Sequence, residues 1–151
     1  MRIICFLLIS IASFKTIAQI VEDIPISFGT IAVVHNDTVG SLAIDIFDNL
    51  SVDNNFRVIT PGNFGVFTVS GLPSNSSLPV EISVTNPTMN PSRAFDESFI
   101  FSVSSFDQTA RADASGNASI RVGGTITTSG TGNRNFEQAT YASQIRITIN
   151  F

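Results

Sequence analysis

Apolar and polar residues alternate along three segments of the chain, and this pattern constrains the fold more than any other feature. The segments are 78–85, 118–127 and 144–151. Apolar side chains at every second position lie on one face of a β-strand. No stretch of about 11 residues or more after Gln19 repeats apolar residues at the spacing of a helix face. The sequence therefore predicts an all-β protein.

Four further segments have weaker strand patterns. They are 41–48, 97–104, 64–70 and 24–33. Segment 64–70 is apolar at both parities, which predicts a strand covered on both sides. In segment 24–33 the apolar parity changes beside Gly29, which predicts a β-bulge at this glycine.

The segments between these strands are short and rich in Asn, Ser, Gly and Pro, as in turns and loops. Seven strands joined by such connections, with no helix between them, predict an antiparallel β-sandwich of about seven strands and immunoglobulin-like type. We expect residues 19–151 to form a single domain, since a chain of this length buries a core of its own.

The first 18 residues have the pattern of a secretory signal peptide. Met1-Arg2 gives a positive start, 3–12 is almost entirely apolar, and Thr16-Ile17-Ala18 supplies the small residues of a cleavage site. A run of about 10 apolar residues is shorter than the roughly 20 that a membrane-spanning helix needs. The predicted product begins at Gln19, has no membrane span, passes through the periplasm and reaches the cell surface or the medium.

The charge balance after Gln19 excludes several kinds of function. The leader contains Arg2, Lys15 and Cys5, so six arginines and all twelve acidic residues remain, a net charge of −6. An acidic chain is a poor match for nucleic acid. Without Lys or Cys it has no Schiff-base chemistry, Lys–Asn cross-link or disulfide, and His35 alone cannot build a Cys/His zinc site. Few charges also mean few of the charged side chains that keep strand edges apart.

Four motifs, taken in order, resemble a family of secreted bacterial proteins known as domain of unknown function 4402 (DUF4402). They are 25–31 (PISFGTI), 65–71 (GVFTVSG), 122–126 (VGGTI) and a closing alternating strand preceded by Tyr141. That family is similar to fimbrial major subunits of the Mat/Ecp type and to spore coat protein U. The resemblance implies a pilin-like sandwich and assembly at a cell surface.

A pilin-like fold suggests that the N-terminal strand completes the sheet of a neighbour. An exchanged strand binds through main-chain hydrogen bonds and alternating side chains. Ile24, Ile26, Phe28 and Ile31 are the candidate strand-exchange residues. The alternative is that this segment is the first strand of a complete domain.

The C-terminal strand is a second candidate for assembly. In pilin families this strand pairs with a periplasmic chaperone, and here its alternating residues are Ile145, Ile147, Ile149 and Phe151. The alternative, compatible with the first, is an ordinary core strand.

Candidate catalytic and metal residues are sparse. His35 and Asp37 share a loop, but no Gly-x-Ser-x-Gly motif accompanies them, and the acidic pairs Asp96-Glu97 and Asp45 with Asp48 have the pattern of surface charges. We predict no enzymatic activity, cofactor or metal. Calcium binding by the Asp- and Asn-rich segment 45–55 is the open alternative to a turn in which these side chains bind the backbone.

Together these patterns predict a secreted, non-enzymatic structural or adhesive subunit of a bacterial cell-surface assembly. Its expected partners are further copies of itself or related surface subunits, with a periplasmic chaperone as a candidate. The alternative is a monomeric binding module for a glycan or protein ligand. One Tyr and no Trp favour assembly over sugar binding, and a coat-like shell protein would share the fold.

Overall fold

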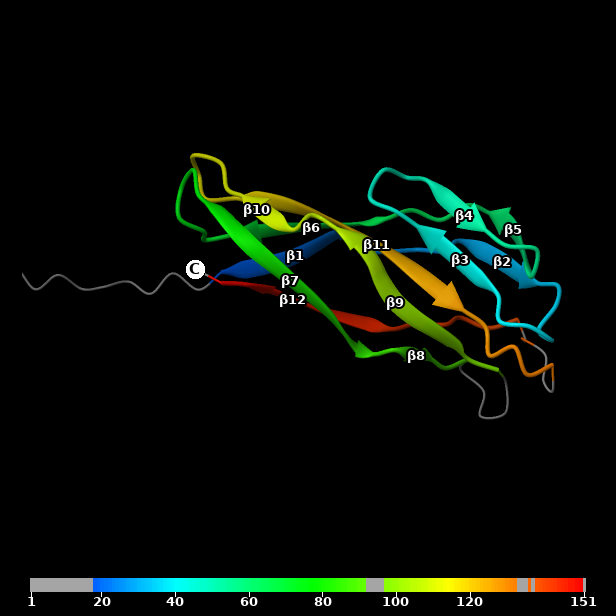
Figure 1. Cartoon of the computed structure of the whole chain (residues 1–151). Helices are drawn as coiled ribbons and strands as arrows, with labels where there is room; N and C mark the ends of the chain where they lie inside the picture. The colour runs from blue at the N-terminus through cyan, green and yellow to red at the C-terminus, as the bar shows by residue number, and fades with distance from the viewer. Residues whose placement is uncertain (1–17, 92–96, 133–135, 137, 151) are drawn as a thin grey trace, which may run out of the picture.

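The computed structural model describes residues 18–91, 97–132, 136 and 138–150, and every regular element among them is a β-strand (Figure 1). The strands are β1 (Gln19–Ile24), β2 (Thr30–Val33), β3 (Ser41–Ile44), β4 (Leu50–Val52), β5 (Phe56–Thr60), β6 (Gly65–Ser70), β7 (Ser77–Asn86), β8 (Thr88–Met89), β9 (Phe99–Phe106), β10 (Thr109–Arg111), β11 (Ala118–Thr127) and β12 (Gln144–Ile149). All strand pairs are antiparallel. The predicted all-β class is confirmed.

The larger sheet is built around β11. Its strand order is β1-β6-β11-β3-β4, and β9 pairs with both β11 and β8. Val122 of β11 pairs with both Gly65 of β6 and Phe106 of β9, so β6 and β9 lie on opposite edges of β11. Residues 124–127 likewise pair with both β3 and β9. Strands β6 and β3 therefore follow one another along one edge of β11.

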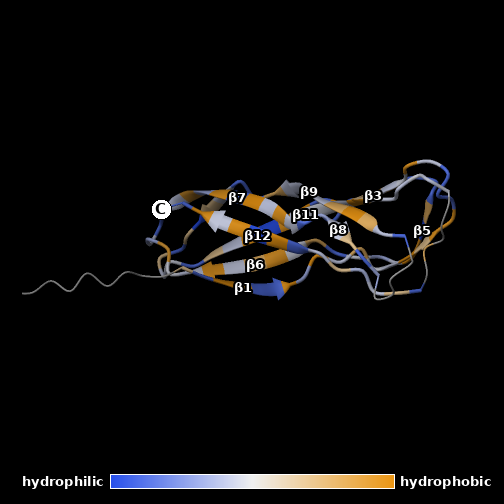
Figure 2. Ribbon diagram, turned by 90° about the horizontal axis from the view of Figure 1, so that it is seen from below, coloured by the Kyte–Doolittle hydropathy of each residue, from blue (hydrophilic) through white to orange (hydrophobic). Residues whose placement is uncertain are grey.

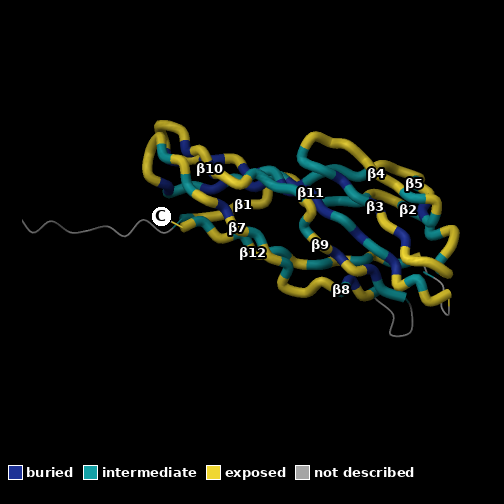
Figure 3. The backbone as a smooth tube through the Cα atoms, in the orientation of Figure 1, coloured by how far each residue is buried: buried dark blue, intermediate teal, exposed yellow. Residues whose placement is uncertain are grey.

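A second layer covers one face of this sheet in two parts. Strands β10, β7 and β12 form a three-stranded sheet, and β2 and β5 form a two-stranded ribbon. Ile120 and Val122 of β11 pack in a core cluster beneath β7 and β10, whereas Ile126, on the same face, packs in a cluster beneath β2 and β5. The result is an elongated sandwich whose buried residues run along β11, β9 and β3 (Figure 3).

Gly124 makes room for large side chains in this core. A Cβ atom at Gly124 would lie 2.5 Å from Cε2 of Phe101 and 3.3 Å from Cζ of Phe28. The two rings pack edge to face with centroids 6.0 Å apart. An inner-face position without a side chain thus allows Phe28 of the N-terminal segment to reach Phe101 of β9.

The three strongest sequence patterns correspond to strands of six to ten residues with one face in the core. Strands β7, β11 and β12 occupy segments 78–85, 118–127 and 144–151, with β7 one residue longer at each end and β12 ending at Ile149, and Figure 2 shows the alternating hydropathy along β6, β7 and β12. The strand predicted over 97–104 overlaps β9, which begins and ends two residues later. The expected count of about seven strands was low because β4, β5, β8 and β10 are only two to five residues long. Such short runs carry too few alternations to be recognised.

The strand expected over 41–48 ends earlier, at Ile44, and Ile46 lies in a turn. The Asp45 carboxylate accepts hydrogen bonds from the backbone N–H groups of Phe47 and Asn49. A side chain that binds its own backbone in this way starts a turn and competes with the strand.

The expectation that segment 64–70 is covered on both sides was wrong. Phe67 and Val69 of β6 are buried, but Val66 and Thr68 on the other face are only half-buried. The second layer covers a single face of the larger sheet, so the apolar Val66 stays partly open to solvent.

The N-terminal segment is two strands and not one bulged strand. Strand β1 pairs with β6, whereas β2 pairs with β5 in the other layer. Gly29, between them, has φ of +73°, and a Cβ atom there would lie 2.0 Å from the Thr60 carbonyl oxygen. The parity change thus marks the passage of the chain from one layer to the other.

Some predicted features lie outside the described residues. Residues 1–17 of the predicted signal peptide are among them. So are the candidate residues Asp96 and Phe151. Among the residues that are described, no helix is long and apolar enough to cross a membrane.

Candidate functional site

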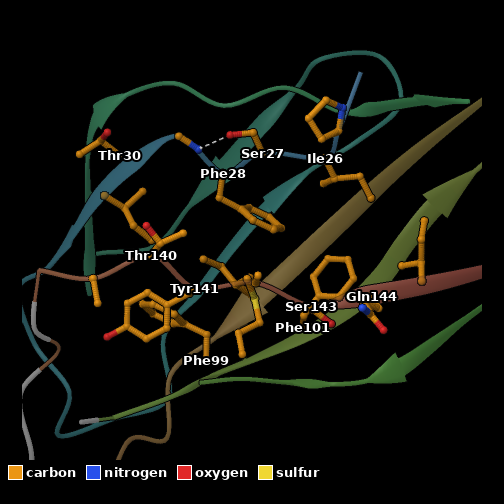
Figure 4. Close-up of a pocket in the computed structure, with 18 of the residues that line it drawn as sticks. Ile26, Ser27, Phe28, Thr30, Phe99, Phe101, Thr140, Tyr141, Ser143 and Gln144 are labelled. Atoms are coloured by element: carbon orange, nitrogen blue, oxygen red, sulfur yellow. Dashed lines mark hydrogen bonds between the residues drawn. The ribbon is translucent and has the colours of Figure 1, made fainter. Parts of the chain in front are cut away.

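A large groove opens on one side of the sandwich, between the N-terminal segment 25–33 and the approach to β12 at 138–146 (Figure 4). Its volume is about 1190 Å³. Buried side chains of the larger sheet form its floor, namely Phe99, Phe101, Ile126 and Met89. The groove is therefore an opening into the apolar core.

Asn63 fixes the N-terminal wall of the groove. Its backbone N–H donates to the Ser27 carbonyl oxygen at 2.8 Å, and the Ser27 N–H donates back to the Asn63 carbonyl oxygen at 3.0 Å. The Asn63 side-chain amide donates to the Pro25 carbonyl oxygen at 2.8 Å. Sequence reasoning missed Asn63, although the composition of Pro61-Gly62-Asn63, which is typical of a turn, is a signal for such a role.

Aromatic stacking fixes the opposite wall. The rings of Phe99 and Phe136 stack with centroids 4.3 Å apart, and Tyr141 meets Phe99 edge to face at 4.8 Å. These contacts hold the segment before β12 against β9. Phe136 was not singled out from the sequence because the residues around it have the composition of a loop and show no alternation of apolar and polar residues.

The structure divides the four candidate strand-exchange residues. Ile26, Phe28 and Ile31 are half-buried, line the groove and pack against the core. Ile24 lies apart from them at the end of β1, where its side chain is 46% exposed. The predicted alternating set is therefore not carried by one strand, because β1 ends at Ile24 and Pro25 follows.

The C-terminal candidates lie along β12. Ile145, Ile147 and Ile149 are half-buried and pack against the core, and Ile145 also lines the groove. The structure thus brings Ile145 to the same groove as Ile26, Phe28 and Ile31. Ile147 and Ile149 continue along the strand away from it.

Strand β1 is the exposed border of the larger sheet. All six of its residues are exposed, among them Ile20 at 41% and Val21 at 45% (Figure 3). Ile20 and Glu22 pair with Val69 and Phe67 and so point to the inner side of the sheet. Glu22 lines the groove. This strand therefore presents apolar side chains on both faces and a carboxylate toward the open side of the sandwich.

A family model described as "Domain of unknown function (DUF4402)" matches residues 18–151. The chain belongs to the DUF4402 family. Neither a curated protein nor a solved structure gives a significant match. Two of the four segments that carry the sequence resemblance lie at the groove: 25–31 forms one wall, and Tyr141 stands in the other.

The candidate catalytic residues of this DUF4402 domain are dispersed over its surface. His35 and Asp37 are exposed in the loop between β2 and β3. Glu97 accepts a hydrogen bond from the Thr131 hydroxyl at 3.1 Å. Among the residues with described positions, no three His, Cys, Asp or Glu side chains gather as metal ligands would.

The Asp- and Asn-rich segment of this DUF4402 domain forms turns held by its carboxylates. Asp45 accepts a hydrogen bond from the Asn49 side-chain amide at 2.7 Å, in addition to those from backbone N–H groups. The Asn49 amide is the main reason why the pKa of Asp45 lies below its ordinary value. Asp53 accepts from the backbone N–H groups of Ser41 and Asn55. These contacts match the turn interpretation of the segment.

Proposed function

We propose that the protein is a secreted, non-enzymatic structural or adhesive subunit of a bacterial cell-surface assembly, and that copies associate through β1. The observation that carries this proposal is the state of β1, a six-residue strand exposed along its whole length. An edge strand with exposed apolar side chains is a template for pairing with another chain. The predicted leader and the similarity to Mat/Ecp-type fimbrial subunits and spore coat protein U support the same role.

Strand exchange is one way in which β1 can join copies. In this mechanism β1 leaves its own β6 and pairs with the β6 of a neighbour in the same register. Because β1 is exposed on both faces, leaving β6 costs few buried contacts, whereas Ile26, Phe28 and Ile31 stay packed in the core. The exchanging unit is thus proposed to be 19–24, and the segment from Pro25 onward serves as the hinge.

The C-terminal strand is proposed to serve assembly in a different way. Within the described residues β12 pairs only with β7, so its other edge is open to a periplasmic chaperone during secretion. Its half-buried isoleucines keep it in the core at the same time.

Deletion of residues 19–24 tests the proposal. The full-length protein, secreted through its own leader, is expected to form concentration-dependent oligomers in light scattering, and the deleted protein is expected to stay monomeric. Addition of a 19–24 peptide should then give a one-to-one complex, whereas the same peptide with Val21→Pro should not bind, since proline removes a ladder N–H group. A full-length protein that stays monomeric at all concentrations would contradict the proposal.

The groove supports a second candidate, a monomeric binding module for a glycan or protein ligand. Its volume of about 1190 Å³ and its lining, which includes Tyr141, Gln144 and Arg146, suit a ligand with apolar and polar parts. Glycan-array binding that Tyr141→Ala abolishes in a monomeric protein would favour this candidate over assembly.

A further inference from the structure

Two strands border the open side of the sandwich, one in each layer. Within the described residues β1 pairs only with β6 and β12 only with β7, so each has one edge without a strand partner. The two strands are equally long, with six residues each. They run in opposite directions, since the start of β1 and the end of β12 lie at the same end of the molecule in Figures 1 and 2.

We propose that two copies of this chain join along these borders in a closed twofold dimer, with β1 of each copy pairing with β12 of the other. This inference rests on the proposed self-association and names its geometry. A twofold axis parallel to the strands exchanges the two layers and keeps the strand directions. The larger sheet of one copy then continues into the three-stranded sheet of the other.

The strand directions give the correct kind of pairing. Because β1 and β12 run in opposite directions within one copy, β1 and the β12 of the second copy are antiparallel neighbours. Antiparallel strands need no crossover and form the more common ladder. The same axis forms two such ladders, so the dimer leaves neither border open. If β1 is exchanged between copies, the β1 that a copy receives on its β6 offers the same open edge to β12.

The charges of the two strands select this pairing over pairing of like strands. Strand β1 carries Glu22 and Asp23, and the one charged residue of β12 is Arg146. Two β1 strands side by side would bring four carboxylates into one ladder, which is unfavourable. Opposing β1 with β12 places a cation beside the acids instead. Strand β4, at the other border of the larger sheet, has only three residues and no charge.

One register pairs three positions of the two strands favourably. With Arg146 opposite Asp23, Val21 stands opposite Thr148 and Ile20 opposite Ile149, while Glu22, beside the bulge of β1 at Asp23, stands opposite Ile147. Val21 and Asp23 lie on the outer side of the sheet, since Val21 pairs with Thr68 and the Thr68 hydroxyl donates to the Asp23 carboxylate at 2.6 Å. Arg146 and Thr148 are likewise exposed, as is Gln144 on the same side of β12. The exposed Ile20 meets the half-buried Ile149 on the inner side.

Cysteine cross-linking tests the geometry directly. The chain carries a single cysteine, Cys5, in the predicted leader, so full-length protein with Cys5→Ser and one introduced cysteine gives an unambiguous result. A mixture of Val21→Cys and Thr148→Cys proteins, with tags of different mass, is expected to form a disulfide between unlike chains. Each protein alone should form far less of its own cross-linked dimer.

A charge reversal provides a second, independent readout. Arg146→Glu is expected to raise the dissociation constant by about tenfold or more, since it places like charges opposite each other in both ladders. Asp23→Arg combined with Arg146→Glu should restore association. Arg57→Glu, at an exposed position of β5, is the matched control and should leave the constant unchanged.

Each outcome decides a separate point. An oligomer that cross-links through Val21→Cys alone, or through neither cysteine, overturns the β1–β12 pairing and leaves self-association standing. A disulfide that forms within one chain of the double variant Val21→Cys/Thr148→Cys also overturns it, since β1 and β12 of the same copy would then lie next to each other. A protein that stays monomeric at all concentrations overturns the dimer and the proposed function together.

Discussion

Arg121 and Asp107 form a bidentate ion pair between β11 and the residue that follows β9. The Arg121 Nε donates to Oδ2 of Asp107 at 3.0 Å, and Nη2 donates to Oδ1 at 2.8 Å. The backbone N–H of Arg121 donates to the same Oδ2 at 2.9 Å. Asp107 lies where the chain passes from the larger sheet to the three-stranded sheet, so the pair fixes this crossing.

Asp107→Asn is expected to lower the free energy of unfolding by about 1 kcal/mol, the upper range for pairs open to solvent. The hydrogen bond from the Arg121 side chain is the main cause that holds the pKa of Asp107 below its ordinary value. A lowered pKa in the folded state stabilises the protein above the unfolded-state value of about 3.9, and this stabilisation disappears as the pH falls through the folded-state value. Urea unfolding of both proteins between pH 2 and 7 measures the difference. Asp37→Asn, in an exposed loop, is the control, and an equal loss in that variant or at all pH values would contradict the expectation.

Asn49→Ala is expected to raise the pKa of Asp45. The side-chain amide of Asn49 is the largest cause of the lowered pKa, and the variant keeps only the backbone N–H groups as donors. Titration of the Asp45 carboxyl carbon by NMR gives the value in both proteins. Asn54→Ala, an exposed residue between β4 and β5, should leave the Asp45 titration unchanged. If both variants titrate like the original chain, the turn is not held by the Asn49 amide.

Gly124→Ala is expected to destabilise the domain by about 1–3 kcal/mol, the range for overpacked cores. The new methyl group would meet Cε2 of Phe101 at 2.5 Å, and Phe101 cannot retreat without disturbing its contact with Phe28. Thr125→Val changes the other face of the same strand and should stay within about 0.5 kcal/mol of the original chain. Denaturant unfolding monitored by circular dichroism compares the two. Equal stability of both variants would show that the inner face has more room at Gly124 than the structure indicates.

Asn63→Ala is expected to loosen segment 25–29 without unfolding the core. The variant removes the side-chain donor to the Pro25 carbonyl oxygen, a loss of about 1 kcal/mol. The two backbone hydrogen bonds with Ser27 remain. Amide hydrogen exchange should therefore quicken at Ser27 and along β1 but not along β11. Asn90→Ala, at an exposed position after β8, is the control. Unchanged amide exchange in the Asn63 variant would show that the Asn63 side chain does not hold the hinge segment.

Local patterns were enough to predict the strands that have one face in the core. Strands β7, β11 and β12 alternate over six to ten residues, and the inner residues Val80, Ile120 and Ile147 follow the predicted parity. The predictions failed where a single side chain or glycine redirects the backbone. Asp45 ends β3 by binding its own turn, and Gly29 carries the chain into the other layer. Both effects depend on contacts that alternation does not encode.

The candidate site was predicted in part. Ile26, Phe28, Ile31 and Ile145 were singled out from their apolar pattern, and they meet at one groove. Asn63 and Phe136, which hold the two walls, were missed because their roles come from partners distant in sequence: Pro25 and Ser27 for Asn63, and Phe99 for Phe136. No property of an isolated loop residue reveals such a partner.

The sequence by itself determined that this chain forms β-strands and which side of β7, β11 and β12 is apolar, because alternation is a property of neighbouring residues along the backbone. Only the tertiary structure decided which strand edges remain open. Pairing joins segments as distant as β1 and β6, or β7 and β12, and it depends on where the chain crosses between layers. The crossing at Pro25–Gly29 leaves β1 at one border and β12 at the other, and these two edges are the surfaces through which we propose that the protein assembles.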